Sequence, residues 1–270
     1  MRKVKELKKS LPLAAVFARL HQEEDAVFLD SSLKNNLGRY SIIGRHPYLK
    51  LIKGEVFTAN GVEQKESFEA YVRRFLKENQ DENETELPIV SGAVGYFSYE
   101  YGRKKEGVKT RHPREVDIPD CILNFYDEFL IEDGLTGKVY GAVSGKCRPA
   151  EEALKELEEL CCQPEEVLEK RTEESWEKEA FQVHPNFEKE AYKQAVDQMI
   201  RYIIEGDIYI ANMTQHLTIK SSKNPYEVFT YLRKHNPSPF GGYFNYGEFQ
   251  VVCASPERFL RMKKGHVMTR

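Results

Sequence analysis

The stretch CILNFYDEFLIE at residues 121–132, with KVYGAV at residues 138–143, decides the fold of this chain. Apolar residues alternate along the first segment and therefore share one face of an extended strand: Leu123, Phe125, Phe129 and Ile131. Asp127 lies between them on the same face. Asp133-Gly134 is a turn sequence, and residues 138–143 again favour a strand. The pattern predicts a β-hairpin.

Upstream of this hairpin, short strands are predicted at residues 26–30, 39–43 and 48–52, separated by Gly, Asn and Pro turns. A helix is predicted over residues 67–77, because five apolar residues fall on one helical face: Phe68, Tyr71, Val72, Phe75 and Leu76. Residues 89–102 are β-rich but contain Gly92 and Gly95. Glycine inside a strand often marks the close approach of another backbone or of a ligand.

Downstream of the hairpin, the pattern predicts a helix at residues 150–161 and a charged linker at 163–180. The most strongly periodic helix covers residues 187–205, with Asn186 as its cap and Gly206 at its end. A strand over 208–219 and a short helix opened by Asn224-Pro225 follow. The remaining predicted strands are 242–246, 249–254 and 258–262.

Composition narrows the class of protein. The chain has 270 residues, of which 40% are hydrophobic and 31% charged, so it can bury a sizeable core. Few strands alternate strictly with helices, which favours an α+β layered fold over a doubly wound sheet. The net charge is −3, and the sequence contains no basic stripe that would favour binding to nucleic acid. No apolar run is long enough to span a membrane.

The termini and the cysteines bear on localisation. The apolar run near the amino terminus, Leu11 to Val16, is too short and weak for a signal peptide. The five cysteines are odd in number and contain no CxxC pair. Free thiols in a reducing cytoplasm are the simplest interpretation.

Six segments in order along the chain carry a family resemblance: FLDSS at 28–32, GRYSIIG at 38–44, GAVGYFSYEYGR at 92–103, EGDIYIANMTQHL at 205–217, NPSPF at 236–240 and ASPERFL at 254–260. Together they resemble the chorismate-utilising enzymes, which include anthranilate synthase and aminodeoxychorismate synthase. The resemblance implies an α+β fold with two face-to-face β-sheets flanked by helices. It also implies an amino-terminal component I-like region at 1–145, a helix and charged linker at 146–186, and the first part of a chorismate-binding domain at 187–270.

The same resemblance implies that the chain is a fragment. A Pro-Ile-(Ala or Lys)-Gly-Thr motif is expected directly after Arg270. The ligands for a Mg²⁺ cofactor, a catalytic histidine and contacts to the substrate carboxylates are expected beyond residue 270.

Glu257, in the SPERF segment, resembles the family's general acid. Replacing the hydroxyl of chorismate with nitrogen requires a proton donor for the departing oxygen, and a carboxyl held at a turn and partly buried suits that role. The alternative is a surface glutamate paired with Arg258.

Residues 210–214 are the predicted substrate contacts. Isochorismate and salicylate synthases have lysine at the position matching Ile210, and amine-adding members usually have glutamine, so this chain departs from both. Asn212 and Thr214 share a face with Ile210 if the segment is a strand. They would line the pocket or, alternatively, bond to neighbouring strands. Asn212 and Gly241-Gly242 look more like aminodeoxychorismate synthases than anthranilate synthases.

Ser31 matches the family position that contacts bound tryptophan, and Arg39, Tyr40 and Ser41 belong to the same region. The alternative for Ser31 is a structural role at the end of a strand.

The resemblance therefore implies an aminodeoxychorismate synthase component I. Such a subunit converts chorismate and ammonia, supplied by a glutamine amidotransferase partner, to 4-amino-4-deoxychorismate for 4-aminobenzoate and folate synthesis. One alternative is anthranilate synthase component I of tryptophan synthesis. Another is a non-catalytic fragment that binds tryptophan or docks the amidotransferase. The 270 residues alone are expected to be inactive.

Overall fold

The computed structural model describes residues 2–8, 11–110, 116–163 and 182–269. The chain divides into two compact units, one formed by Met1–Glu166 with Pro225–Arg270 and the other by Val167–Asn224. The charged linker predicted at 163–180 lies, from residue 164 onward, outside the described residues.

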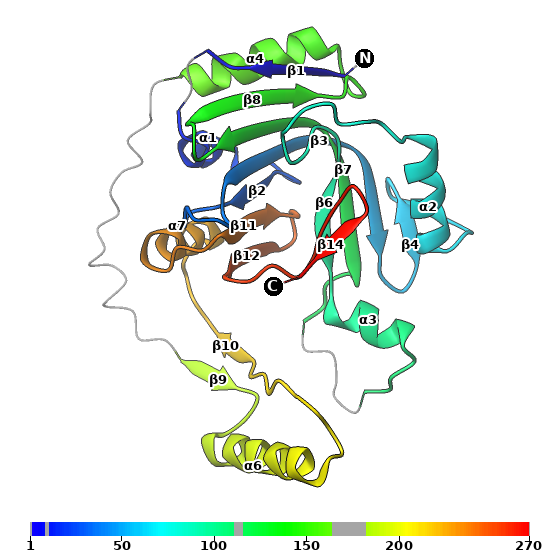
Figure 1. Cartoon of the computed structure of the whole chain (residues 1–270), viewed down its shortest axis with the longest axis vertical. Coiled ribbons are helices and arrows are strands. Elements are labelled where there is room, and N and C mark those ends of the chain that lie inside the picture. The colour runs from blue at the N-terminus through cyan, green and yellow to red at the C-terminus, as the bar shows by residue number, and fades with distance from the viewer. Residues whose placement is uncertain (1, 9–10, 111–115, 164–181, 270) are drawn as a thin grey trace. The chain divides into compact units, whose positions relative to one another are not determined.

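The first unit is built on a ten-stranded antiparallel sheet (Figure 1). Its main path runs in the order β1 (Lys3–Glu6), β8 (Lys138–Val143), β7 (Cys121–Asp133), β3 (Tyr40–Lys53), β2 (Val27–Asp30), β11 (Phe240–Asn245) and β12 (Gln250–Ser255). Three further strands lie off this path: β4 (Phe57–Ala59) pairs with β3, β5 (Val62–Glu63) pairs with β4, and β6 (Gly92–Phe97) pairs with β7. This mixture of antiparallel sheet and helices confirms the α+β class.

The hairpin of β7 and β8 is confirmed, with Asp133 opposite Lys138. Gly137 in the loop has φ +70°, a left-handed conformation that glycine adopts without strain. β7 lies between β8 and β3, and side chains on both of its faces are buried. Its buried side chains include the fully enclosed Asp127 and Glu128.

The strands predicted at 39–43 and 48–52 are one continuous strand, β3, so the turn expected between them is wrong. Gly44, Arg45 and Pro47 stay in the ladder because β3 pairs with β7 on both sides of this segment. The register shifts between Pro47 and Leu49, and His46 has φ +50°. This β-bulge accommodates a proline that has no N–H to give to the ladder.

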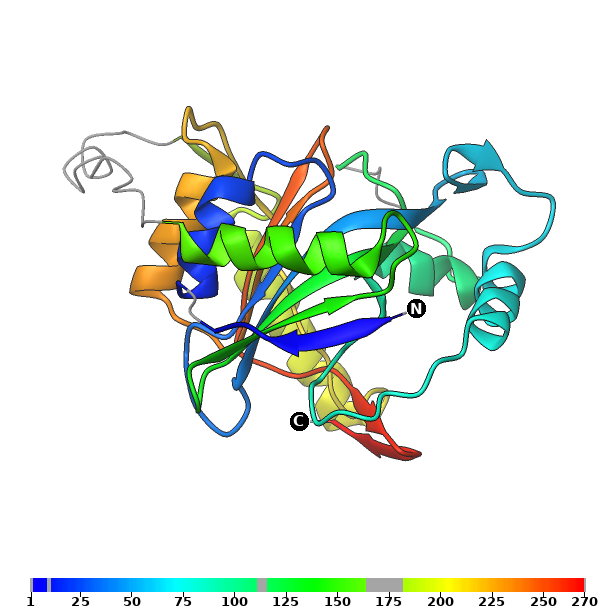
Figure 2. The same ribbon diagram turned by 90° about the horizontal axis from the view of Figure 1, so that it is seen from above.

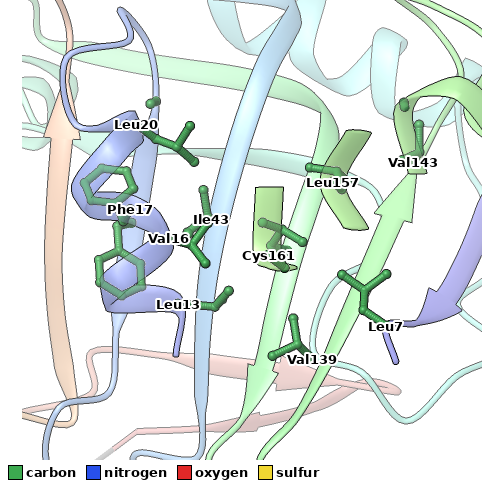
Figure 3. Packing of buried hydrophobic residues seen from close by; sticks show 14 of the residues in the cluster. Leu7, Leu13, Val16, Phe17, Leu20, Ile43, Val139, Val143, Leu157 and Cys161 are labelled. Atoms are coloured by element: carbon green, nitrogen blue, oxygen red, sulfur yellow. The ribbon is translucent and has the colours of Figure 1, made fainter. Parts of the chain in front are cut away.

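Three helices cover one face of the sheet (Figure 2): α1 (Leu13–Leu20), α4 (Ala150–Cys162) and α7 (Pro225–His235). Between them and the strands lies the largest apolar cluster, whose packing around α1 is seen in Figure 3. Phe17 is fully buried there and stacks on Phe28 at 5.1 Å between ring centroids. Helix α7 packs against this cluster, and β11 pairs with β2, so the segment from Pro225 onward lies in the same compact unit as the amino-terminal strands.

The helix predicted at 67–77 is confirmed as α2 (Phe68–Glu78), which packs over the other end of β3 and β7. The Ser67 side chain caps it by accepting from the Ala70 N–H. Gly95 in β6 confirms the expected close approach, because a Cβ there would lie 1.8 Å from the Ile122 carbonyl oxygen. The β-rich prediction is wrong after residue 98, where α3 (Tyr99–Lys105) begins behind a Ser98 cap.

The second unit contains α6 (Lys189–Glu205) and the short ribbon of β9 (Val183–Pro185) and β10 (Leu217–Ile219). Gly206 ends α6 as predicted, with φ +83°. The Asn186 cap is wrong, because its Oδ1 accepts from the His216 N–H in the ribbon. No residue of α6 is buried. Ala195, Val196 and Met199 of its predicted apolar face are half-buried, whereas Ile203 and Ile204 are exposed.

The strand predicted over 208–219 is wrong for residues 208–216. Only β10 pairs, and its partner β9 is three residues long. A strand needs a neighbour to satisfy its N–H and C=O groups. The strand predicted at 258–262 is displaced to β13 (Arg261–Lys263), which forms a ribbon with β14 (His266–Met268) in the first unit.

Candidate functional site

Glu257 follows β12 in a turn that the side chain of Ser255 organises. The Ser255 hydroxyl donates to the Glu257 carbonyl oxygen at 3.2 Å and lies 3.4 Å from the Glu257 N–H. The backbone is thus held, but the Glu257 side chain is exposed among the described residues, and the expected partial burial is not observed. The first unit presents this carboxyl at its surface rather than in a closed pocket.

Arg258, the next residue, attaches this turn to the loop after β2. Its Nη2 donates to the Leu37 carbonyl oxygen at 3.2 Å, and its guanidinium lies over the Phe240 ring at 5.1 Å. Arg258 therefore holds the Glu257 turn against the loop before the GRYSIIG segment at 38–44 and against Phe240 of the NPSPF segment at 236–240. Both segments carry the family resemblance.

The structure brings together three of the four residues predicted for a tryptophan pocket. The Ser31 hydroxyl lies 2.8 Å from the Tyr40 carbonyl oxygen and 3.0 Å from that of Pro239. The Ser31 N–H donates to the Ser41 hydroxyl at 3.2 Å. Because protein groups already satisfy Ser31, its hydrogen bonds agree with the structural alternative, and a ligand at this hydroxyl would compete with them.

Arg39, the fourth residue, is held by Asp133 at the end of β7. Its Nε and Nη2 donate to the two carboxylate oxygens at 3.0 and 2.8 Å, and its guanidinium lies over the Tyr40 ring. The hydrogen bond from Arg39 lowers the pKa of Asp133 to about 2, against the opposing effect of burial. Arg39, just before β3, therefore links β3 to the turn between β7 and β8 through its ion pair with Asp133.

Asp30 is a polar member of this region that the sequence interpretation left without a role. It is 3% exposed, accepts from the Ser41 hydroxyl at 3.2 Å, and accepts from Arg233 Nε of α7 at 2.7 Å. The sequence signal for its role was an acidic residue at the end of an otherwise apolar predicted strand, residues 26–30. Asp30 ties the Ser31 region to helix α7.

The glycine pair of β11 has a packing reason. A Cβ on Gly241 would lie 3.1 Å from the Asp30 carbonyl oxygen, and one on Gly242 would lie 3.0 Å from the Phe244 ring. Both positions favour a residue without a side chain because β2 and β11 approach closely. Because close packing explains both glycines, they are weaker support for an aminodeoxychorismate synthase over an anthranilate synthase than the sequence alone indicated.

The three predicted substrate contacts belong to the second unit. Ile210 is 72% exposed, and Asn212 and Thr214 are also exposed. None lies in a strand, so the argument that they share a strand face does not hold in this structure. The described residues do not assemble them into a pocket.

A buried charged cluster in the first unit was missed. Glu128 is 0% exposed and accepts from Arg148 Nε and Nη2 at 2.9 and 2.7 Å and from His46 Nδ1 at 3.0 Å. Arg45 Nη1 lies 3.7 Å from its other oxygen. Burial alone would raise the pKa of Glu128, but the hydrogen bonds from His46 and Arg148 outweigh it and lower that pKa. The cluster joins β3, β7 and the start of α4.

The described residues contain no group of three or more His, Cys, Asp or Glu side chains that could hold a metal ion. Within the same residues, no helix has the length and hydropathy needed to cross a membrane. All five cysteines are free thiols.

Comparisons with known proteins agree with this architecture. The family model for chorismate binding enzymes matches residues 25–270. Anthranilate synthase component 1 of Acetivibrio thermocellus is 27% identical over 92% of this chain and 54% of that protein. Aminodeoxychorismate synthase component 1 of Bacillus subtilis (strain 168) is 29% identical over 86% of this chain and 50% of that protein.

Among solved structures, anthranilate synthase component I from Streptococcus pneumoniae TIGR4 superposes with a TM-score of 0.69 at 19% identity. The match covers 87% of this chain and 54% of that one. It confirms the α+β fold expected from the sequence.

The antiparallel sheet with its covering helices thus has the fold of that solved structure. The chain belongs to the chorismate binding enzyme family. It spans about half the length of the curated relatives it matches.

Proposed function

We propose that this chain is part of an aminodeoxychorismate synthase component I, which replaces the 4-hydroxyl of chorismate with an amino group. The observation that carries the proposal is the family match over residues 25–270, which includes the Glu257 turn. Asn212 in the ANMTQ segment supports the aminodeoxychorismate product, and the absence of a lysine at Ile210 argues against activation of water.

Glu257 is proposed to protonate the oxygen that leaves chorismate. A general acid must lie within hydrogen-bond reach of that oxygen and be shielded from water, which strengthens its electrostatic interactions. The Ser255 hydroxyl and the anchored Arg258 fix the backbone on either side of Glu257, so they would orient it. Because Glu257 is exposed here, further residues would have to cover it in the working enzyme.

The proposal includes a Mg²⁺ ion that would hold a carboxylate of chorismate. The described residues offer no acidic cluster for it, so no step of the reaction is assigned to a metal held by them. It also includes a glutamine amidotransferase partner as the source of ammonia and a cytoplasmic location, which the five free thiols support.

The experiment compares this chain with a protein that extends it to the length of its relatives. Both are incubated with chorismate, ammonium and Mg²⁺, and 4-aminobenzoate is measured after addition of a lyase. The extended protein should give 4-aminobenzoate, its Glu257→Gln variant should lose at least about 100-fold in kcat, and the 270-residue chain should give none. Lys155→Gln, at a side chain 80% exposed on α4, is the matched control and should keep full activity. Turnover by the 270-residue chain, or a fully active Glu257→Gln variant, would contradict the assignment of roles.

Anthranilate synthase component I is the second candidate, favoured by the similarity to the Acetivibrio protein. In the same assay, fluorescent anthranilate formed without the lyase would replace the first proposal by this one. Tryptophan binding is a separate question, which calorimetry of the chain with tryptophan answers. Loss of binding in Ser41→Ala would place tryptophan beside Ser31, whereas no binding would leave Ser31 with its structural role.

A further inference from the structure

A groove in the first unit lies away from both Glu257 and the Ser31 region. Its volume is about 840 Å³, within the range of small-molecule sites. It is lined by the end of α2 and the residues after it, the start of β6, the middle of β3 and β7, Arg2, and the loop after β8. None of the residues assigned above to catalysis, substrate or tryptophan lines it.

The floor of the groove is aromatic. Tyr48, Phe75 and Phe125 line it, and Phe75 meets Phe125 edge to face at 4.8 Å between centroids. Phe125 is buried, whereas Tyr48 and Phe75 are half-buried and present ring surface to the groove. Such a floor offers stacking and edge contacts to a flat apolar ligand.

The rim of the groove carries positive charge that other charges do not neutralise. Arg2 is paired with Asp81 at 2.6 Å, and Glu78 is paired with Arg74. Lys77 and Lys146 also line the groove, and neither forms a salt bridge with another described residue. An anionic group on a ligand would therefore meet two available ammonium groups.

The loop that carries Lys146 is held in place before any ligand arrives. The buried carboxylate of Asp127 accepts from the Lys146 N–H at 2.8 Å and from the Cys147 N–H at 3.0 Å. The Asp127 carbonyl oxygen accepts from the Ser144 N–H at 2.8 Å. A rigid loop loses little conformational freedom when it binds a ligand.

Two hydroxyl groups complete the lining. The Ser144 hydroxyl is buried and has no hydrogen-bond partner within the described part of the chain. A buried polar group without a partner is costly, and a ligand oxygen would relieve that cost. Burial also raises the pKa of Tyr48, so its phenol keeps its proton as a possible donor.

We propose that this groove is a binding site for a small aromatic carboxylate, with the ring on Tyr48, Phe75 and Phe125 and the carboxylate facing Lys77, Lys146 and Ser144. The site is independent of the proposed catalytic role of Glu257, because it requires no residue from that turn.

The test uses the 270-residue chain and 2-naphthoate, followed by calorimetry and by saturation-transfer NMR. We expect 2-naphthoate to bind, and both 2-naphthamide, which lacks the charge, and cyclohexanecarboxylate, which lacks the ring, to bind at least about fivefold more weakly. Lys77→Gln and Lys146→Gln should each weaken 2-naphthoate binding about threefold, and the double variant about tenfold. Lys155→Gln, which removes an exposed charge on α4 away from the groove, should change nothing.

All three lysines are exposed, so these variants should keep the melting temperature of the parent chain and report on binding alone. Equal binding of 2-naphthoate and its amide would overturn the proposal. So would a double variant that binds like the parent, which would place the ligand elsewhere, or no binding up to about 10 mM. None of these outcomes would bear on chorismate turnover.

Discussion

Replacing Glu128 by glutamine should destabilise the first unit far more than any surface change. The variant keeps the size of the side chain but removes the charge that accepts from Arg148 at 2.9 and 2.7 Å and from His46 at 3.0 Å. Glu128 is fully buried, and removing one member of a buried ion pair costs about 3–5 kcal/mol. Arg45 keeps Glu23 and Arg148 keeps Glu156, so the expected loss lies just below that range, at about 2–3 kcal/mol.

The loss is measured at pH 7 as the change in the free energy of unfolding in urea, followed by circular dichroism. An unchanged dependence of that free energy on urea concentration in the variant would confirm two-state behaviour. A thermal scan should show a melting temperature lower by roughly 4–12 °C. Glu156→Gln is the matched control, since it joins the same cluster with a side chain that is 46% exposed and should cost under about 1 kcal/mol. Equal losses in the two variants would refute the argument from burial.

The pH dependence gives a second readout of the same cluster. The pKa of Glu128 is lowered in the folded chain, so its contribution to stability is fully present above the pKa of an unfolded glutamate, about 4.3, and disappears as the pH falls through the folded value. The difference in stability between the parent chain and Glu128→Gln should therefore shrink below about pH 4. A difference that stays constant down to the acid transition would contradict this assignment.

Three further outcomes are expected. Gly95→Ala should release β6 from β7, because its Cβ would lie 1.8 Å from the Ile122 carbonyl oxygen. Amide hydrogen exchange at residues 92–97 should therefore become faster. The control is Gly102→Ala in α3, where a Cβ meets nothing within 4 Å, and it should leave that exchange unchanged. Arg39→Met should move the pKa of Asp133 from about 2 toward 3.9 in an NMR titration, and should remove stability that the parent chain has in full above pH 3.9 and loses as the pH falls toward 2; an unmoved titration would exclude Arg39 as the cause. Iodoacetamide should label the exposed Cys147 and Cys162 well before the buried Cys121 and Cys161, because burial raises the pKa of the last two thiols to about 12; mass spectrometry showing equal rates would refute their burial.

The sequence predicted elements correctly where one local pattern dominated. The alternation in residues 121–132 gave the central hairpin, and the helical stripe around Phe68 gave α2. Gly206 ended α6 as expected, because its left-handed conformation is a local requirement. These features depend on neighbours in sequence, which the sequence displays directly.

Long-range pairing could not be predicted in the same way. The turn expected near Gly44 became part of β3 because β7 supplies a partner along its full length. The strand expected at Ile210 has no such partner within the second unit, and its residues remain outside any strand. Local sequence carries the preference for extended backbone, but only a neighbour decides whether that backbone pairs.

For the candidate site, the order of short motifs in the sequence was enough to indicate the chorismate-utilising family and to single out Glu257 and Ser31. Only the tertiary structure decided that Glu257 stands exposed, that Ser31 is satisfied by the Tyr40 and Pro239 carbonyl oxygens, and that Glu128 is buried among arginines. The reason is physical. The type of a side chain fixes which proton or charge it can offer, whereas its exposure and its partners come from segments that are distant in sequence and that meet only when the sheet closes.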